Sequence, residues 1–186
     1  MNDEKIKQEM PGRVARWADL EGFSGGHPDS GYEGYDRKLY SVIGFGSPDD
    51  ATSGDPDSGN PHVSSPAGSL SSANTAVGID EGLNVAFLEV EPNNGVAYHS
   101  HDTNETFVVL DGRWRFFWGE GEGESVVLGP RDTISFPGPA VRRFVNVSDQ
   151  KGTLLMIIAG SKPRAFWHPE VIERLRADAK QKASPR

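Results

Sequence analysis

The chain has 186 residues with a formal net charge of -8, and 35% of them are hydrophobic. This length suffices for one domain of ordinary size with extensions. The negative charge disfavours nucleic acid and anionic membrane surfaces as partners, and no apolar stretch approaches the roughly 20 residues that span a bilayer. Because cysteine is absent, any metal site must use nitrogen and oxygen ligands.

Residues 1–74 are expected to form an N-terminal arm followed by a loop. Residues 1–10 are charged and lack an apolar secretory segment, which predicts a cytoplasmic protein. Residues 13–22 fit either a short helix or an edge strand, whereas residues 38–46 are rich in β-forming side chains and predict a strand. Gly, Ser, Pro, Asp and Asn dominate residues 47–74, which predicts a long loop that serves as a lid or a linker.

Residues 75–162 alternate short apolar segments with turn residues, and no helical pattern interrupts them. This spacing predicts an all-β domain, either an antiparallel sandwich or a barrel. Asp111-Gly112 predicts a two-residue hairpin, because a type I′ turn needs positive φ at both central positions. In the next segment, the alternation of side chains places Trp114, Phe116 and Trp118 on one face, in the core.

Residues 163–186 predict a helical tail. Pro169 fits the first position of a helix, and the acidic residues precede the basic ones, as the helix dipole favours. Val171, Ile172 and Leu175 lie on one apolar stripe. We therefore expect a C-terminal amphipathic helix that packs on the β-domain or on a second subunit.

The segment YHSHDTNETFVVLDG, residues 98–112, carries the main chemical signal. Residues two apart share one face of a strand but diverge on a helix, so His99 and His101 converge only if the segment is extended. Glu105 opens the next expected strand and heads an inward row that continues with Phe107. Two imidazoles and one carboxylate would hold one side of a divalent ion and leave positions open for water, oxygen or substrate. The alternative is a pair of half-exposed histidines beside a polar turn.

The same residues resemble the first motif of the cupin superfamily, which is His-x-His, three or four residues, Glu, six residues, Gly. His99, His101, Glu105 and Gly112 fall in register with this motif. The segment PGPAVRRFVN, residues 137–146, is similar to the second motif, Pro-x-Gly, two residues, His, three residues, Asn. The resemblance implies a single cupin barrel, also called a double-stranded β-helix or jelly roll, with an N-terminal arm and a C-terminal helix.

The chain departs from the family pattern at three positions. Asn93 and Pro139 stand where the family has glycines, at turns that a change of turn type can absorb. Arg142 stands where the family has its third histidine ligand, and a guanidinium has no lone pair to give a metal. The usual set of four ligands is therefore one short. Three further histidines lie beside prolines in expected loops, and one of them could supply the missing ligand from a folded-over arm: His27, His62 and His168.

Arg142 has three interpretations. In the first, His99, His101 and Glu105 hold Fe(II) or a similar ion, and Arg142 clamps a carboxylate or other anion of the substrate. In the second, Arg142 pairs with Glu105 inside a cavity without metal. The metal would be absent because, at ~5 Å and an effective dielectric near 20, the charge of Arg142 would repel a divalent ion by roughly 7 kcal/mol. In the third, a register change of one residue turns Arg142 outward.

The resemblance implies a small-molecule enzyme. Under the first interpretation, we expect an iron-dependent enzyme with dioxygenase-type chemistry on an anionic or oxygen-bearing substrate. Under the second, we expect a metal-free cupin that binds a small anionic ligand or acts as an isomerase or lyase, with His99 or His101 as general base. A homodimer is also expected, because cupin barrels often pair their sheets.

Overall fold

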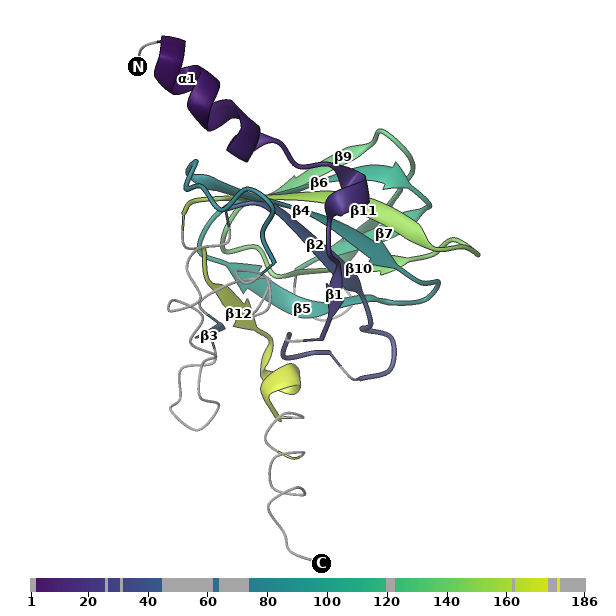
Figure 1. The fold of residues 1–186 in the computed structure, drawn as a ribbon. Helices are drawn as coiled ribbons and strands as arrows, with labels where there is room; N and C mark the ends of the chain where they lie inside the picture. Colours follow the sequence, from purple (N-terminus) through teal and green to yellow (C-terminus); the bar gives the residue numbers. More distant parts are fainter. Residues whose placement is uncertain are drawn as a thin grey trace, which may run out of the picture.

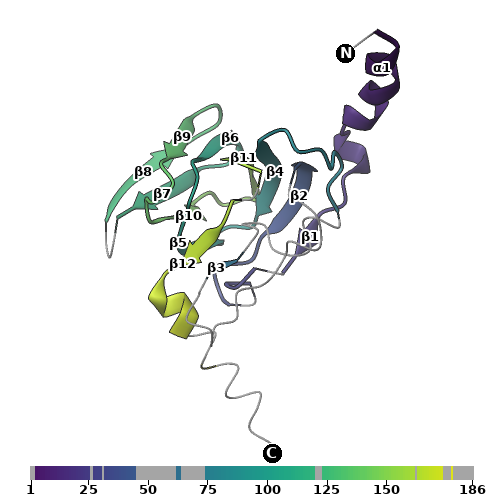
Figure 2. The ribbon, with the colours of Figure 1, turned by 90° about the vertical axis from the view of Figure 1, so that its left-hand side faces the viewer.

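The computed structural model of the chain describes residues 3–25, 27–30, 32–44, 62–63, 74–119, 123–161, 163–173 and 177. These residues form two antiparallel sheets of six strands each, which pack face to face with the short helices outside them (Figure 1, Figure 2). The predicted all-β class, with an N-terminal arm and a C-terminal helix, is confirmed. None of the described helices is long and apolar enough to cross a bilayer.

The order of strands in each sheet differs from their order in the sequence. The first sheet is ordered β1 (Phe23–Ser24), β2 (Lys38–Ile43), β4 (Leu83–Val90), β11 (Gly152–Ala159), β6 (Glu105–Asp111) and β9 (Thr133–Phe136). The second is ordered β3 (His62–Val63), β12 (Ala165–Trp167), β5 (Gly95–His101), β10 (Arg142–Asn146), β7 (Trp114–Trp118) and β8 (Glu124–Leu128). Strands that follow one another in sequence repeatedly change sheets, as in a jelly roll.

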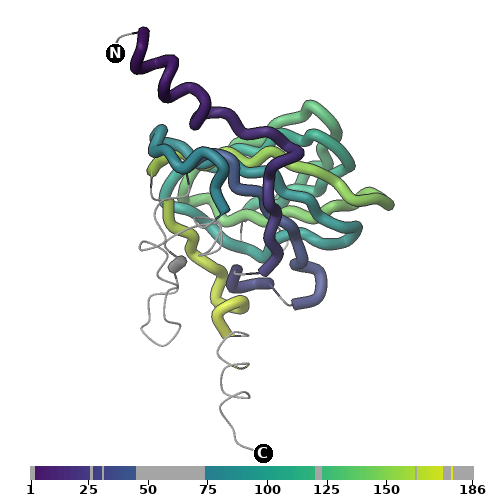
Figure 3. The backbone as a smooth tube through the Cα atoms, in the orientation of Figure 1, coloured from purple at the N-terminus to yellow at the C-terminus, as the bar shows by residue number. Residues whose placement is uncertain are grey.

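The N-terminal arm projects from the barrel before the chain turns back onto it (Figure 1). It contains the helix α1 (Asp3–Glu9) and the 3-10 turns η1 (Met10–Arg13) and η2 (Trp17–Asp19). Trp17 fastens the arm to the first sheet, because its ring centroid lies 4.8 Å from that of Tyr40 and 5.4 Å from that of Phe87. The chain then descends along the barrel to the end where the C-terminal segment emerges (Figure 3).

The structure tests some of the expectations for residues 1–74. Residues 13–22 contain a 3-10 turn, and the edge strand β1 follows directly after them. The strand predicted at residues 38–46 is β2, which joins the first sheet. The loop predicted at residues 47–74 lies outside the described residues, apart from β3 and residue 74.

The predicted C-terminal helix begins at Pro169, and residues 169–173 are helical. Val171 and Ile172 are buried and belong to the hydrophobic core, so this turn packs on the barrel as expected. Leu175, the third member of the predicted stripe, lies outside the described residues.

Aromatic side chains fill much of the barrel interior. Trp114 and Phe116 are fully buried, as the alternation in their strand predicts, whereas Trp118 at the end of the strand is only partly buried and packs against the core. Phe107 from β6 and Phe144 from β10 meet between the sheets with ring centroids 5.2 Å apart, and Phe107 lies 5.5 Å from Phe116. Rings at these separations pack favourably edge to face. Phe107 and Phe144 of this cluster line the same cavity as His99, His101 and Glu105.

The hairpin predicted at Asp111-Gly112 is wrong. Gly112 has a φ of +84°, but Asp111 does not have the positive φ that a type I′ turn also requires. Strand β6 pairs with β11 and β9, whereas β7 pairs with β10 and β8, so the turn leads from one sheet to the other. Trp114 holds this crossing by donating its indole N–H to the carbonyl of Asp111 at 2.9 Å.

A tight approach between β5 and β10 requires glycine at position 95. A Cβ added to Gly95 would lie 1.9 Å from the carbonyl oxygen of Phe144. Two residues earlier, Asn93 has a φ of +62°, the left-handed conformation for which the family uses glycine. The substitution at Asn93 is therefore absorbed locally, as predicted.

The contact at Gly95 gives a stability prediction. Gly95→Ala should lower the free energy of unfolding by about 2 kcal/mol or more, because the strands must separate to admit the methyl group. Urea denaturation of the parent and the variant measures this difference. Gly129→Ala is the matched control, since a Cβ there meets nothing within 4 Å. Equal losses in both variants would contradict the close approach.

Candidate metal centre

Strand β5 carries both histidines on its inner face because residues two apart in a strand share a face, and a bulge places Val96 on that face as well. Arg142 of β10 pairs with His99, and Phe144 pairs with Val96, so two steps on β10 match three on β5. An extra residue in one strand shifts the side-chain alternation by one position. Val96, His99 and His101 consequently all line the interior. The extended conformation predicted for this segment is confirmed, although the bulge was not predicted.

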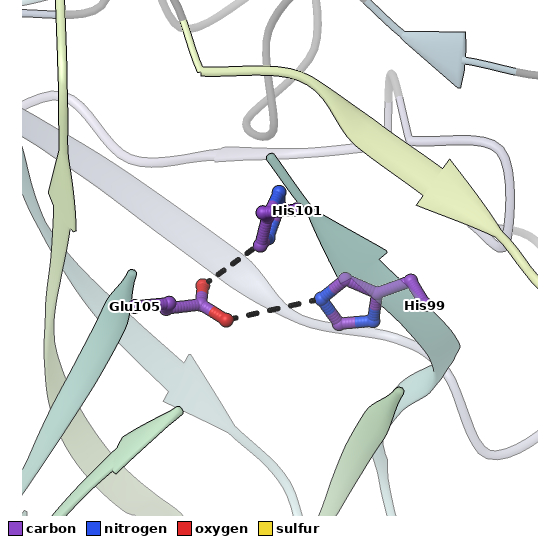
Figure 4. Close-up of side chains that lie close together, drawn as sticks. All are labelled: His99, His101 and Glu105. Atoms are coloured by element: carbon purple, nitrogen blue, oxygen red, sulfur yellow. Dashed lines mark ion pairs between the residues drawn. The ribbon is translucent and has the colours of Figure 1, made fainter. Parts of the chain in front are cut away.

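The structure brings together the three residues that were predicted to converge. His99, His101 and Glu105 are 5%, 3% and 2% exposed, and their candidate ligand atoms all lie within 4.8 Å of one another. Nε2 of His101 lies 3.6 Å from Oε1 of Glu105, and Nε2 of His99 lies 4.0 Å from Oε2 (Figure 4). Both imidazoles thus point at the carboxylate from the neighbouring sheet. The alternative of half-exposed histidines beside a turn is wrong.

Backbone carbonyls fix how each imidazole presents its nitrogen atoms. Nδ1 of His99 lies 2.8 Å from the carbonyl oxygen of Ala97, and Nδ1 of His101 lies 3.0 Å from that of Arg164. A carbonyl only accepts, so Nδ1 carries the proton in both rings. In the neutral imidazole, Nε2 then has a free lone pair directed at the interior. Metal-binding histidines are commonly held in this way.

Residues of β12 and of the segment just before it support the two histidines. Asp102 accepts hydrogen bonds from the backbone N–H of Arg164 at 2.8 Å and from its Nε at 2.7 Å, which fixes the carbonyl group that holds His101. The Trp167 ring packs on His99 with centroids 5.2 Å apart. Sequence reasoning missed both supports, because it assigned Arg164 and Trp167 to a helical tail.

Arg142 is buried and points inward, beside Glu105. Its Nε and Nη2 donate to Oε2 of Glu105 at 2.9 and 2.8 Å, and its Nη1 donates to the carbonyls of Gly138 and Ala140 at 3.2 and 3.0 Å. The side chain is 1% exposed, so the interpretation in which it turns outward is wrong. The pairing with Glu105 is the contact foreseen in the second interpretation. Oε1 of Glu105 is left facing His101.

The electrostatics favour a charged Glu105 and a neutral His99. Burial alone would raise the pKa of Glu105, but the Arg142 guanidinium and then the two histidines lower it, and the resulting pKa lies far below its ordinary value. Burial lowers the pKa of His99 well below 6.5, and the charges of His101 and Arg142 lower it further. At neutral pH, Glu105 is therefore ionised and His99 is uncharged. These are the protonation states in which both residues bind metal ions.

A small cavity of about 30 Å³ adjoins the three residues. This volume holds roughly two water-sized groups. The apolar part of its wall consists of Leu39, Leu88, Val96, Phe107, Phe144 and Met156. The polar part of the wall consists of the three candidate ligands together with His27, Arg37 and Trp167.

His27 reaches the cavity from the N-terminal arm, so one of the three outlying histidines does approach the site. It does not belong to the cluster of converging ligand atoms that the described residues form. His168 packs against Tyr98 with ring centroids 6.2 Å apart. The side chain of His62 lies outside the described part of the structure. Arg37 was not predicted as a site residue, because no local sequence pattern reveals a contact between residues about 60 positions apart.

The ion pair gives a second stability prediction. Arg142→Met should lower the free energy of unfolding by about 3–5 kcal/mol, because it leaves Glu105 charged and buried. The double variant Glu105→Gln/Arg142→Met should recover much of this loss, since neither charge remains. Urea denaturation of the parent, both single variants and the double variant gives the coupling energy. Additive losses would show that the two side chains do not depend on each other.

The pH dependence of stability follows from His99. Its folded pKa is lowered, so the unfolded chain binds more protons below pH 6.5, and the free energy of unfolding should fall as pH decreases from that value. Glu105 adds a second loss below about pH 4.5, again because its folded pKa is lowered. Urea midpoints in the presence of chelator measure both effects. His99→Gln should flatten the first decline, and an unchanged slope in that variant would refute its assignment to His99.

Comparisons with known proteins agree with this geometry. The cupin domain family matches residues 86–158. A comparison with curated protein sequences finds no significant match. Among solved structures, vicilin from hazelnut, Corylus avellana, is 15% identical and aligns over 82% of this chain and 35% of its own, with a TM-score of 0.51.

Two other structures show weaker similarity. A Cupin 2 conserved barrel domain protein from Salinispora arenicola is 15% identical over 54% of this chain and 75% of its own, with a TM-score of 0.39. An oxalate oxidase is 17% identical over 52% of this chain and 63% of its own, with a TM-score of 0.45. The chain thus spans less than two thirds of the vicilin and the oxidase, and likeness at these identities concerns the fold alone. The family match and the paired sheets establish that this chain contains a cupin domain.

Proposed function

We propose that the chain is a metal-dependent small-molecule enzyme in which His99, His101 and Glu105 hold a divalent ion, with Fe(II) as the native metal. The reaction is of the dioxygenase type, and the substrate is anionic or bears oxygen. One observation carries the proposal. Both imidazoles have Nδ1 bonded to a carbonyl, which leaves two Nε2 lone pairs directed at an ionised carboxylate.

The residues of the site have separate tasks in this proposal. A divalent ion bound here would act as a Lewis acid, and iron would add chemistry with dioxygen. His99 and His101 orient the ion, and Glu105 supplies the negative charge. Arg142 positions Glu105 by holding Oε2, so that Oε1 stays directed toward His101. The apolar wall excludes bulk water, which strengthens the electrostatic interactions inside.

Arg142 affects the metal less than a lone charge would. Glu105 lies in direct contact with it and offsets its charge, so the repulsion expected for an isolated guanidinium is largely compensated. Its direct contact with a substrate anion stays a prediction. Four hydrogen bonds to protein groups leave one of its five N–H groups for that purpose.

A second candidate function is a metal-free cupin that binds a small anion or acts as an isomerase or lyase. The observation that favours it is the paired arrangement of Glu105 and Arg142, which satisfies the buried carboxylate without a metal. Nε2 of His101 lies 3.6 Å from the other oxygen of that carboxylate. The expected homodimer and the expected cytoplasmic location also stay predictions.

Metal analysis separates the two candidates. Protein purified without chelator should contain a single transition-metal ion per chain, measured by elemental analysis and by calorimetric titration of the stripped protein under anaerobic conditions. His101→Ala should reduce the metal affinity by at least about a hundredfold, because one of three protein ligands is lost. His168→Ala is the matched control, since this histidine lies on Tyr98 and outside the cluster.

The outcomes are distinct. Equal metal content in His101→Ala and the parent would remove the basis of the metal-dependent proposal, provided that circular dichroism shows both to be folded. A parent protein that binds no transition metal would favour the second candidate. Arg142→His should bind the metal more tightly than the parent, because it adds a third imidazole, and so a fourth ligand, at a position that already faces inward.

A further inference from the structure

The indole of Trp167 presents an unsatisfied hydrogen-bond donor beside the metal site. Trp167 is 5% exposed and lines the same cavity as His99, His101 and Glu105. Within the described part of the chain, its Nε1 has no hydrogen-bond acceptor. Buried N–H groups in folded proteins are nearly always paired with protein groups, water or a ligand. An acceptor inside the cavity would satisfy this donor.

Arg37 brings a positive charge to the same cavity. It lines the wall and is anchored by Asp29, which receives hydrogen bonds from Nη1 at 3.0 Å and Nη2 at 2.8 Å. Oδ2 of Asp29 also accepts the backbone N–H of Ala97 at 3.0 Å, and the carbonyl of Ala97 holds His99. The N-terminal arm is therefore bonded to the residue whose carbonyl orients a ligand-type histidine.

The charges around the cavity balance before a metal ion enters. Glu105 is offset by Arg142, and Asp29 is offset by Arg37. A divalent ion adds two positive charges to this neutral set, in a region with a partly apolar wall. A negatively charged ligand would restore the balance, since an uncompensated buried charge is strongly disfavoured.

We propose that the cavity binds a small anion, such as the carboxylate group of the substrate, through the indole N–H of Trp167 and the positive charge of Arg37. The inference rests on the proposed function for the ion that attracts the anion, whereas the two donor residues belong to the protein itself. Substrate recognition is then the task of β12 and the N-terminal arm, which lie on either side of residues 86–158, the region that matches the cupin domain family. Arg142, whose Nε and Nη2 donate hydrogen bonds to Glu105, then orients that candidate metal ligand.

The size of the cavity restricts the anion. About 30 Å³ accommodates roughly two water-sized groups. Formate, the smallest carboxylate, is the organic anion nearest to this size. Formate is therefore the probe of choice, because it carries the charge and the two acceptor oxygens without a further chain.

The test compares formate binding in the parent and in a variant whose aromatic ring at position 167 lacks the N–H group. The parent and Trp167→Phe are loaded with Co(II), and formate is titrated by calorimetry while the visible spectrum of the cobalt is recorded. Phenylalanine keeps an aromatic ring on His99 but has no donor. We expect the dissociation constant for formate to rise at least about tenfold, while the dissociation constant for Co(II) changes less than about twofold. Arg37→Lys should weaken formate binding in the same direction.

Trp118→Phe is the matched control, because this partly buried tryptophan on β7 does not line the cavity. Equal formate affinity in Trp167→Phe and the parent would overturn the inference. A parallel loss of Co(II) affinity would also overturn it, since Trp167 would then act on the metal through His99. If the parent binds no metal ion, the proposed function fails, and the same formate comparison on the metal-free proteins decides the anion site alone.

Discussion

The ion pair between Glu105 and Arg142 is the interaction on which the organisation of the site depends. It places a full negative charge inside a barrel where burial would otherwise favour the neutral acid. The guanidinium is itself held by two carbonyls of the turn before β10, so the carboxylate has a fixed orientation. The two histidines are arranged around that carboxylate (Figure 4). A residue that cannot bind metal thus orients one that can.

Local sequence rules predicted the centre of this site well. The two-residue period of a strand was enough to converge His99 and His101, and the turn after them was enough to bring Glu105 opposite. The same alternation correctly placed Trp114 and Phe116 in the core. These predictions succeeded because each relies on neighbours a few residues apart along one strand.

Features that depend on distant parts of the chain could not be predicted in this way. The turn at Gly112 has the sequence of a hairpin, but the sheets that β6 and β7 join are chosen by pairing with β11 and β10. The bulge in β5 results from its pairing with β10, and no pattern within β5 reveals it. The contacts of Arg37 and Trp167 with the cavity likewise arise only after the chain has folded. Sequence periodicity carries no information about such long-range contacts.

The residues that line the cavity come from two different parts of the chain. The ligand-type histidines and glutamate lie within residues 86–158, where the family match is found, whereas Arg37 and Trp167 lie outside it. A barrel of this kind can therefore retain its metal ligands while its flanking segments diverge. The flanking segments also support both histidines, through the carbonyl of Arg164 and the ring of Trp167, so substitutions there would change the cavity and the orientation of its imidazoles together. The shape of this pocket is therefore set jointly by the barrel and by the segments that flank it.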